Sequence, residues 1–188
     1  MSSEFLPIDE GKARAIELVI LDVDGVLTDG GIYVGATQAG EPVEMKRFHV
    51  EDGLGVKFLG KAGLRVAVVS GRVSEATNLR AMEIGVHQIH QDPGAHKLPI
   101  VLRIMSEMGV EWDAVAMLGD DLADLPVLER AGLPCTVANG VAEVRQVCTW
   151  QSRRTGGQGA VREFTEALLR ARGQWDALVE EYKLERGA

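Results

Sequence analysis

The sequence predicts an α/β fold in which a Rossmann-like parallel sheet is flanked by helices. Short apolar runs rich in branched residues alternate along the chain with segments of helical spacing. Such runs are typical of strands that are buried on both faces, as in the parallel sheets of α/β proteins. Because 188 residues is the size of one compact unit, we expect residues 1–188 to form a single domain.

The apolar runs, together with residues that begin or end helices, define the expected elements. Ser74 is a candidate N-cap, and Pro126 stands in a first turn. Candidate helix stops are Gly63, Gly85 and Gly109. Strands are expected at residues 18–21, 65–69, 114–118 and 132–138. Helices are expected at residues 52–62, 74–84, 97–108, 124–130, 161–172 and 175–184.

Two segments depart from this alternation. Residues 31–48 follow the first strand directly and predict an inserted β-hairpin with a glycine-containing turn. Residues 153–188 form a tail with a glycine-rich stretch and two helices, which leaves no length for a cap domain. An apolar stripe in the last helix indicates packing or an oligomer contact rather than a ligand site. It consists of Trp175, Leu178, Val179 and Tyr182.

Charge and composition exclude several classes of protein. The chain has 20 Lys and Arg against 28 Asp and Glu, and its net charge of -8 argues against binding to nucleic acid or to an anionic membrane. A phosphorylated substrate would also be repelled, unless a metal ion or a few cations reverse the charge locally. The sequence has no apolar run of membrane-spanning length and no signal-peptide core, and its two cysteines form no C-x-x-C pair. We therefore expect a soluble protein in the reducing cytoplasm.

Acidic side chains follow two of the predicted strands. Asp22 and Asp24 come directly after the first strand, and Asp120 and Asp121 follow the strand at 114–118. Ligands bind at the carboxyl ends of parallel strands, so these side chains should share one functional edge. Clustered carboxylates repel one another unless a cation lies between them, and oxygen ligands of this kind suit Mg²⁺.

Purely structural roles of these acidic residues remain as alternatives. Asp22 and Asp24 could belong to a plain turn at the end of a strand, and Asp124 could simply cap the helix that follows it. A calcium loop is excluded, because Val26 stands where that loop requires an acidic or amide residue.

Cationic and hydroxyl groups occupy matching places after the other strands. Ser70, Gly71 and Arg72 follow the strand at 65–69 and supply a hydroxyl, backbone N–H groups and a guanidinium. Such a turn before a helix can receive phosphate oxygens. Lys97 begins a later helix and, taken alone, would be an ordinary surface residue. Together with the other segments it indicates a phosphate-binding site.

In order and spacing, these segments resemble the four motifs of the haloacid dehalogenase superfamily. The resemblance extends from residue 17 to residue 137. Finer features are similar to a small branch without a cap domain, typified by phosphatases of 3-deoxy-D-manno-octulosonate 8-phosphate (Kdo-8-phosphate). These features are the segment 21–30, the hairpin after it, Phe48-x-Val50-x-Asp52-Gly53, and Gly156-Gly157-x-Gly159-Ala160-Val161-Arg162-Glu163.

The resemblance implies a Mg²⁺-dependent phosphatase that acts on a small sugar-acid phosphate. Asp22 would attack phosphorus and form an aspartyl-phosphate, and Asp24 would protonate the leaving alcohol and then activate water. Ser70 and Lys97 would bind the transferring phosphoryl group, and Gly71 would place its backbone beside them.

The resemblance also implies a metal site. Mg²⁺ would be held by the Asp22 carboxylate, the Asp24 backbone carbonyl and Asp120. Asp121 would act through water, and Asp124 would orient Lys97 or the metal shell.

Fewer residues indicate the substrate than indicate the phosphatase chemistry. Arg72 favours the eight-carbon acid Kdo-8-phosphate, because the related phosphatases of nine-carbon keto-deoxy acids tend to carry Glu at this position. Glu51, Glu83 and the loop 91–97 depart from the Kdo-8-phosphate pattern, so a nine-carbon acid phosphate stays an alternative. Further candidates for substrate contacts are His49, Arg80, Arg154 and Arg162.

Members of this branch are typically tetramers, which implies a homotetramer here. The hairpin 31–48 would pack against its counterparts, and the glycine-rich tail would reach a neighbour's active site and shield it from water. Kdo as product would connect the enzyme to lipopolysaccharide biosynthesis. A remaining alternative is a non-catalytic module associated with a nucleotide-sugar synthetase. Transfer of phosphate between sugars is disfavoured, because such enzymes normally carry a large cap domain.

Overall fold

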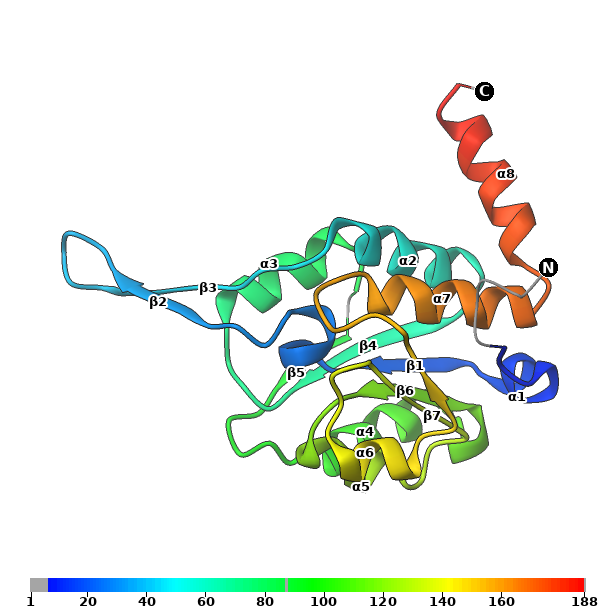
Figure 1. The fold of residues 1–188 in the computed structure, drawn as a ribbon, viewed down its shortest axis with the longest axis horizontal. Helices are drawn as coiled ribbons and strands as arrows, with labels where there is room; N and C mark the ends of the chain where they lie inside the picture. Colours follow the sequence, from blue (N-terminus) through cyan, green and yellow to red (C-terminus); the bar gives the residue numbers. More distant parts are fainter. Residues whose placement is uncertain (1–6, 87, 188) are drawn as a thin grey trace.

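A six-stranded parallel sheet in the order β5-β4-β1-β6-β7-β8 forms the centre of the molecule (Figure 1). It is seen in a computed structural model, which describes residues 7–86 and 88–187. The strands are β1 Leu18–Leu21, β4 Arg65–Ser70, β5 Gln88–Gln91, β6 Val115–Gly119, β7 Leu133–Thr136 and β8 Trp150–Gln151. The predicted α/β fold with a parallel sheet is therefore confirmed.

Helices cover both faces of this sheet (Figure 1). On one side lie α1 Glu10–Ala15, α2 Val50–Lys61, α3 Glu75–Glu83, α7 Ala160–Ala171 and α8 Trp175–Glu185. On the other lie α4 Lys97–Met108, α5 Leu125–Leu128 and α6 Ala142–Val147. Val19 and Leu21 of β1 face the first group, whereas Leu18 and Ile20 face the second. Among the residues described, no helix has the length and apolar character to cross a bilayer.

The sheet order places a topological switch point beside β1. From β1 the chain continues to β4 and β5 on one side, and then returns to β6, β7 and β8 on the other. Leu21 at the end of β1 is in register with Val68 of β4 and Leu118 of β6. The crevice at such a reversal is where open α/β sheets bind ligands, so the ends of β1 and β6 form the natural site.

Several elements depart from the sequence expectations. The short edge strands β5 and β8 and the helices α1 and α6 were not anticipated, because β5 and β8 lack the apolar runs that mark central strands. The helix expected at 124–130 is shorter: a 3₁₀ turn at Leu122–Asp124 precedes α5. Ser74 does occupy the N-cap of α3, but its buried hydroxyl makes no hydrogen bond there. Gly109 ends α4 in the left-handed conformation, as expected.

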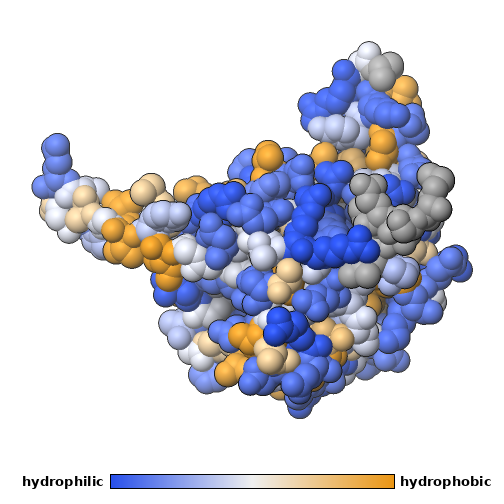
Figure 2. All heavy atoms as spheres, in the orientation of Figure 1, coloured by the Kyte–Doolittle hydropathy of each residue, from blue (hydrophilic) through white to orange (hydrophobic). Residues whose placement is uncertain are grey.

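The predicted hairpin forms a long arm that leaves the body of the molecule (Figure 1). It consists of β2 Tyr33–Ala36 and β3 Pro42–Met45, paired antiparallel with Tyr33 opposite Met45. A bridge between Thr28 and Phe48 closes its base. Figure 2 shows that apolar surface gathers along this arm. Its exposed apolar residues are Ile32, Tyr33, Val34, Val43 and Met45.

A buried carboxylate joins α2 to α7. Asp52, only 1% exposed, accepts a 2.7 Å hydrogen bond from the backbone N–H of Arg162 in the first turn of α7. Its second oxygen is buried without a partner. Burial raises the pKa of Asp52 to about 6, against the favourable effect of the Arg162 N–H. The charge on this side chain therefore opposes folding at neutral pH.

We expect Asp52→Asn to stabilise the protein at pH 8. The folded-state pKa lies above the unfolded value of 3.8, so the stability that Asp52 contributes is present below pH 3.8 and is lost as the pH rises through 6. Asn keeps an acceptor for the Arg162 N–H and removes that loss, which amounts to about 3 kcal/mol. Denaturant unfolding of both proteins at pH 8 and pH 4 measures the difference, which should shrink at the lower pH.

Asp52→Ala is the control, because it removes the acceptor as well as the charge. It should destabilise the protein at pH 4, where little of the unfavourable charge is present, and should stabilise it less than Asp52→Asn does at pH 8. An Asp52→Asn protein that is less stable than wild type at pH 8 would show that the charge itself holds α7.

Candidate active site

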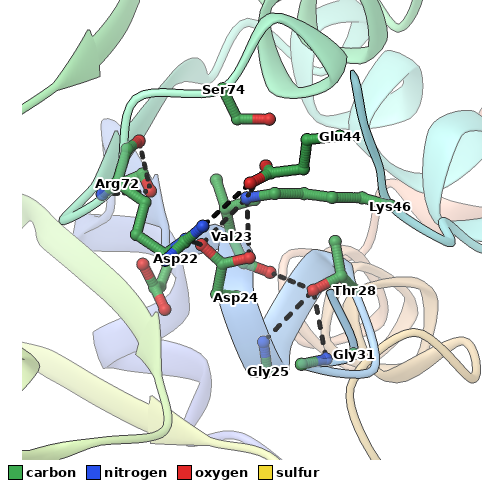
Figure 3. Close-up of polar contacts among 12 residues, drawn as sticks. Asp22, Val23, Asp24, Gly25, Thr28, Gly31, Glu44, Lys46, Arg72 and Ser74 are labelled. Carbon is green, nitrogen blue, oxygen red and sulfur yellow. Dashed lines mark hydrogen bonds and ion pairs between the residues drawn. The ribbon is translucent and has the colours of Figure 1, made fainter. Parts of the chain in front are cut away.

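The chain reverses sharply directly after β1. Asp22 extends the sheet ladder, since its N–H donates to the carbonyl of Leu118 at 3.0 Å. Gly25 then adopts a φ of 91°, a left-handed conformation that other residues avoid. The hydroxyl of Thr28, fully buried, donates to the Val23 carbonyl and accepts from the Gly25 N–H (Figure 3). This turn fixes the direction in which Asp22 and Asp24 leave the strand.

Lys97, the first residue of α4, lies between two carboxylates. Its Nζ is 2.5 Å from Asp22 Oδ1 and 2.6 Å from Asp124 Oδ1, and its side chain is 4% exposed. Burial lowers the pKa of Lys97, but the two neighbouring carboxylates outweigh burial and raise the pKa above its usual value. The residue is therefore a fixed positive charge at the end of β1.

Three carboxylates meet at the ends of β1 and β6. One oxygen each of Asp22, Asp120 and Asp124 lies within 4.8 Å of the others. Burial raises the pKa of Asp22 to about 6, with a further contribution from Asp124 and an opposing one from Lys97. Burial likewise raises the pKa of Asp120 to about 8, and the charges of Asp22 and Asp124 add to it. We call these three residues the acidic cluster. Together they carry more negative charge than Lys97 alone can neutralise.

A divalent cation fits this acidic cluster. Oδ1 of Asp120 is buried and has no hydrogen-bond partner, so it is available as a ligand. A side chain at position 25 would collide with the Asp120 carboxylate, and Gly25 is what lets the two segments approach. An all-oxygen donor set with unbalanced negative charge matches the preference of Mg²⁺.

The structure divides the predicted acidic residues differently from the sequence expectation. Asp124 joins the acidic cluster, and its other oxygen accepts the N–H groups of Asp120 and Asp121 at 2.9 and 3.2 Å. Asp121 lies outside the cluster, where its exposed side chain accepts the N–H of Leu122 at 2.7 Å. Asp24 also turns its carboxylate away from the cluster, toward the hairpin (Figure 3).

The predicted phosphate-binding turn follows β4. The hydroxyl of Ser70 is buried and accepts the Arg72 N–H at 3.1 Å. Gly71 packs closely against Ala95, at a distance that a larger residue would prevent. The guanidinium of Arg72 lies 3.9 Å from Asp24 and forms a 2.8 Å ion pair with Glu44 of the hairpin. The turn therefore reaches the site, with Arg72 on the side of Asp24.

Two hairpin residues at the site were missed by sequence reasoning. Lys46 Nζ lies 2.7 Å and 3.0 Å from the two carboxylate oxygens of Asp24 (Figure 3). Glu44 lies between Lys46 and Arg72. The available signal was the alternation of these two charged residues with Val43 and Met45, which indicates one polar face on the arm.

The remaining substrate candidates contact other parts of the chain. Arg80 donates to the backbone carbonyl of His49 at 2.9 Å and pairs with a glutamate of its own helix. Arg154 pairs with Glu51 at 3.0 Å. Arg162 lies over the ring of Trp175, 4.9 Å from its centroid. These three arginines therefore contact residues outside the acidic cluster.

The glycine-rich segment 156–159 lies against the site of its own chain. The N–H of Gly157 donates to the Val26 carbonyl at 3.1 Å, and that of Gly156 donates to the Asn139 side chain at 2.8 Å. A side chain at position 156 would collide with the backbone of Gly25. These glycines therefore permit close packing on the Asp22 turn of their own chain, and the reach of this segment to a neighbour's site stays a prediction.

The chain is similar in sequence to proteins of a known family. Residues 81–164 match the model of haloacid dehalogenase-like hydrolases. The 3-deoxy-D-manno-octulosonate 8-phosphate phosphatase KdsC of Escherichia coli K12 is 38% identical over 165 residues, which are 88% of this chain and 85% of the relative. The KdsC of Haemophilus influenzae is 37% identical over 163 residues, 87% of this chain and 88% of the relative.

Solved structures agree with these relatives. The phosphatase of this name from Moraxella catarrhalis, in complex with magnesium, phosphate and KDO, is 37% identical with a TM-score of 0.85, covering 92% of this chain and 97% of the other. The one from Yersinia pestis is 34% identical with a TM-score of 0.81, covering 89% and 88%. Identity at this level extends over most of both chains, and Asp22 after β1, Lys97 of α4 and the carboxylates of Asp120 and Asp124 after β6 converge at one edge of the sheet. The chain therefore belongs to the family of 3-deoxy-D-manno-octulosonate 8-phosphate phosphatases, within the haloacid dehalogenase-like hydrolases.

Proposed function

We propose that this protein hydrolyses Kdo-8-phosphate to Kdo and phosphate through an aspartyl-phosphate on Asp22. The observation that carries the proposal is the contact of Asp22 with Lys97 inside the acidic cluster, with Asp24 two residues further along the turn. The Moraxella relative, described with magnesium, phosphate and KDO, supports the same reaction. A cytoplasmic enzyme that supplies Kdo for lipopolysaccharide biosynthesis belongs to this proposal.

The reaction takes place in two transfers. An Asp22 carboxylate oxygen attacks phosphorus while the bond to the leaving oxygen breaks, and Asp24 gives its proton to that oxygen. Water then attacks the aspartyl-phosphate, Asp24 takes the proton of the water, and the bond between phosphorus and Asp22 breaks. Lys97 and Ser70 bind the equatorial phosphoryl oxygens during both transfers.

The acidic cluster would hold Mg²⁺ in this reaction. Asp22, Asp120 and Asp124 supply the carboxylates, and we keep the Asp24 carbonyl and a water-mediated role of Asp121 as parts of the proposal. The ion, when bound, offsets the repulsion between an anionic nucleophile and an anionic ester.

The sugar acid would be recognised on the Arg72 side of the site. A guanidinium suits the substrate carboxylate, and Arg72 lies next to Asp24, where the leaving group must be. A nine-carbon keto-deoxy acid phosphate remains the alternative substrate, because Glu51, Glu83 and the loop 91–97 depart from the Kdo-8-phosphate pattern. Phosphate release from a panel that contains both acids distinguishes them.

A homotetramer is also part of the proposal. The hairpin exposes Tyr33 and Met45 to 53% and 61%, beside Val34 at 75%, and apolar surface of this kind is typical of subunit contacts. Between β1 and α2 the described chain contains this hairpin and no cap domain, so another subunit would have to shield the site. Sedimentation of the active enzyme tests the assembly.

Asp22→Asn should lower phosphate release from Kdo-8-phosphate by at least about a thousandfold, because an amide oxygen is a poor nucleophile. Steady-state assays with Mg²⁺ measure the rate, and acid quenching with labelled substrate measures the phosphoenzyme, which should disappear. Asp176→Asn, at a side chain 93% exposed on α8, is the matched control and should retain full activity. Near-normal turnover of Asp22→Asn would refute the assigned nucleophile.

Asp120→Asn should make the melting temperature of the protein nearly independent of Mg²⁺. Because the folded-state pKa of Asp120 is raised from 3.8 to about 8, its contribution to stability falls as the pH rises through 8, and Asn avoids this loss. With chelator at pH 8, the variant should melt a few degrees above wild type. Saturating Mg²⁺ should raise the melting temperature of wild type and change that of the variant little. An equal gain in both would exclude Asp120 as a ligand.

A further inference from the structure

The side chain of Lys46 is buried although most of the arm around it is exposed. Its side chain is 0% exposed, whereas all of β2 is exposed. The ammonium contacts both oxygens of Asp24 and lies 3.9 Å from Oε1 of Glu44. Burying an ammonium is unfavourable unless it is paired, so this contact is a specific feature of the site rather than a way to cover surface.

The geometry of the arm explains how a charged residue reaches the site. Glu44 and Lys46 are two residues apart on extended chain and face the Asp22 turn, while Val43 and Met45 are exposed. Arg72 continues the row through its 2.8 Å pair with Glu44. Charges of alternating sign therefore extend from Asp24 through the hairpin to the turn after β4.

The contact also keeps Asp24 apart from the acidic cluster. A fourth carboxylate free to turn toward a divalent cation would be attracted to it as a further ligand. Lys46 draws the Asp24 carboxylate to the opposite side, beside Arg72. That side is where the leaving oxygen of the substrate must lie if Asp22 attacks in line.

We propose that Lys46 is a positioning residue for Asp24. Its ammonium holds the Asp24 carboxyl on the leaving-group side of the site, so the arm contributes to proton transfer as well as to the surface of the molecule. The inference rests on the proposed role of Asp24 as general acid. Lys46 itself transfers no proton to the substrate.

Lys46→Met tests this role with two leaving groups. Kdo-8-phosphate releases an alkoxide that needs a proton, whereas p-nitrophenyl phosphate releases a stable phenolate that needs little help. The variant should lose about 10- to 100-fold in kcat with Kdo-8-phosphate, with KM changed less than about threefold. With p-nitrophenyl phosphate, kcat should change less than about threefold. Lys46→Arg should recover part of the loss.

Arg47→Met is the matched control on the same arm. Arg47 contacts Asp29 and the Gly157 carbonyl, at 3.3 Å and 3.2 Å, and makes no contact with Asp24 among the residues described. It should lower kcat less than about threefold with either substrate. Thermal melting of each variant shows whether the arm and body remain folded.

A double-mutant cycle with Asp24→Asn decides whether Lys46 acts through Asp24. Once Asp24 is replaced, Lys46→Met should cost nothing further with Kdo-8-phosphate. Equal losses with both substrates, or a loss that persists beside Asp24→Asn, would overturn the inference and leave the phosphatase intact. Wild type that cleaves p-nitrophenyl phosphate and simple alkyl phosphates but not Kdo-8-phosphate would overturn the proposed substrate, and an alkyl phosphate would then replace Kdo-8-phosphate in the cycle. Wild type that cleaves no phosphate ester would overturn both.

Discussion

The ion pairs of Lys97 with Asp22 and Asp124 are the constraint on which the site depends. They join the end of β1, the start of α4 and the turn after β6, three segments that are far apart in the sequence. An ammonium is needed there because three carboxylates converge at the switch point of the sheet. If Lys97 were absent, the acidic cluster would lose the cation that contacts two of its carboxylates, and burying these charges would be strongly unfavourable. In the proposed reaction the same ammonium binds the phosphoryl group, so Lys97 would be required both for folding and for catalysis.

Close backbone approach is the second condition for the site. Gly25 leaves room for the Asp120 carboxylate, and Gly156 packs on the backbone of Gly25 itself. The tail therefore lies directly behind the turn that carries Asp22. Asp52 adds a further link, because it caps α7 at the end of the same glycine-rich segment. Among the described residues, the C-terminal part of the chain thus packs on the turn that carries Asp22 and supplies no side chain to the acidic cluster.

Sequence reasoning located the site because strand ends in a parallel sheet are predictable. Asp22 and Asp120 directly follow central strands and Ser70 ends one, so their convergence follows once the alternation of strands and helices is recognised. The choice between Asp121 and Asp124 was not predictable, because a single 3₁₀ turn decides which of them points inward. Lys46 was missed for a different reason. A local sequence pattern does not indicate how the hairpin is oriented relative to the sheet. The contact of Lys46 with Asp24 joins residues that are 22 positions apart in the sequence.

The arm has a consequence for inhibition of this enzyme. Compounds aimed at the acidic cluster must imitate a highly charged phosphate ester, and such compounds cross membranes poorly. The outer face of the arm is apolar, with Val34 and Met45 exposed, while its inner face holds Lys46 against Asp24. A neutral, apolar molecule that shifts the arm would displace a charged group at the reaction centre without entering it. Inhibitors of a phosphate site in this fold could therefore bind an apolar surface instead of the site itself.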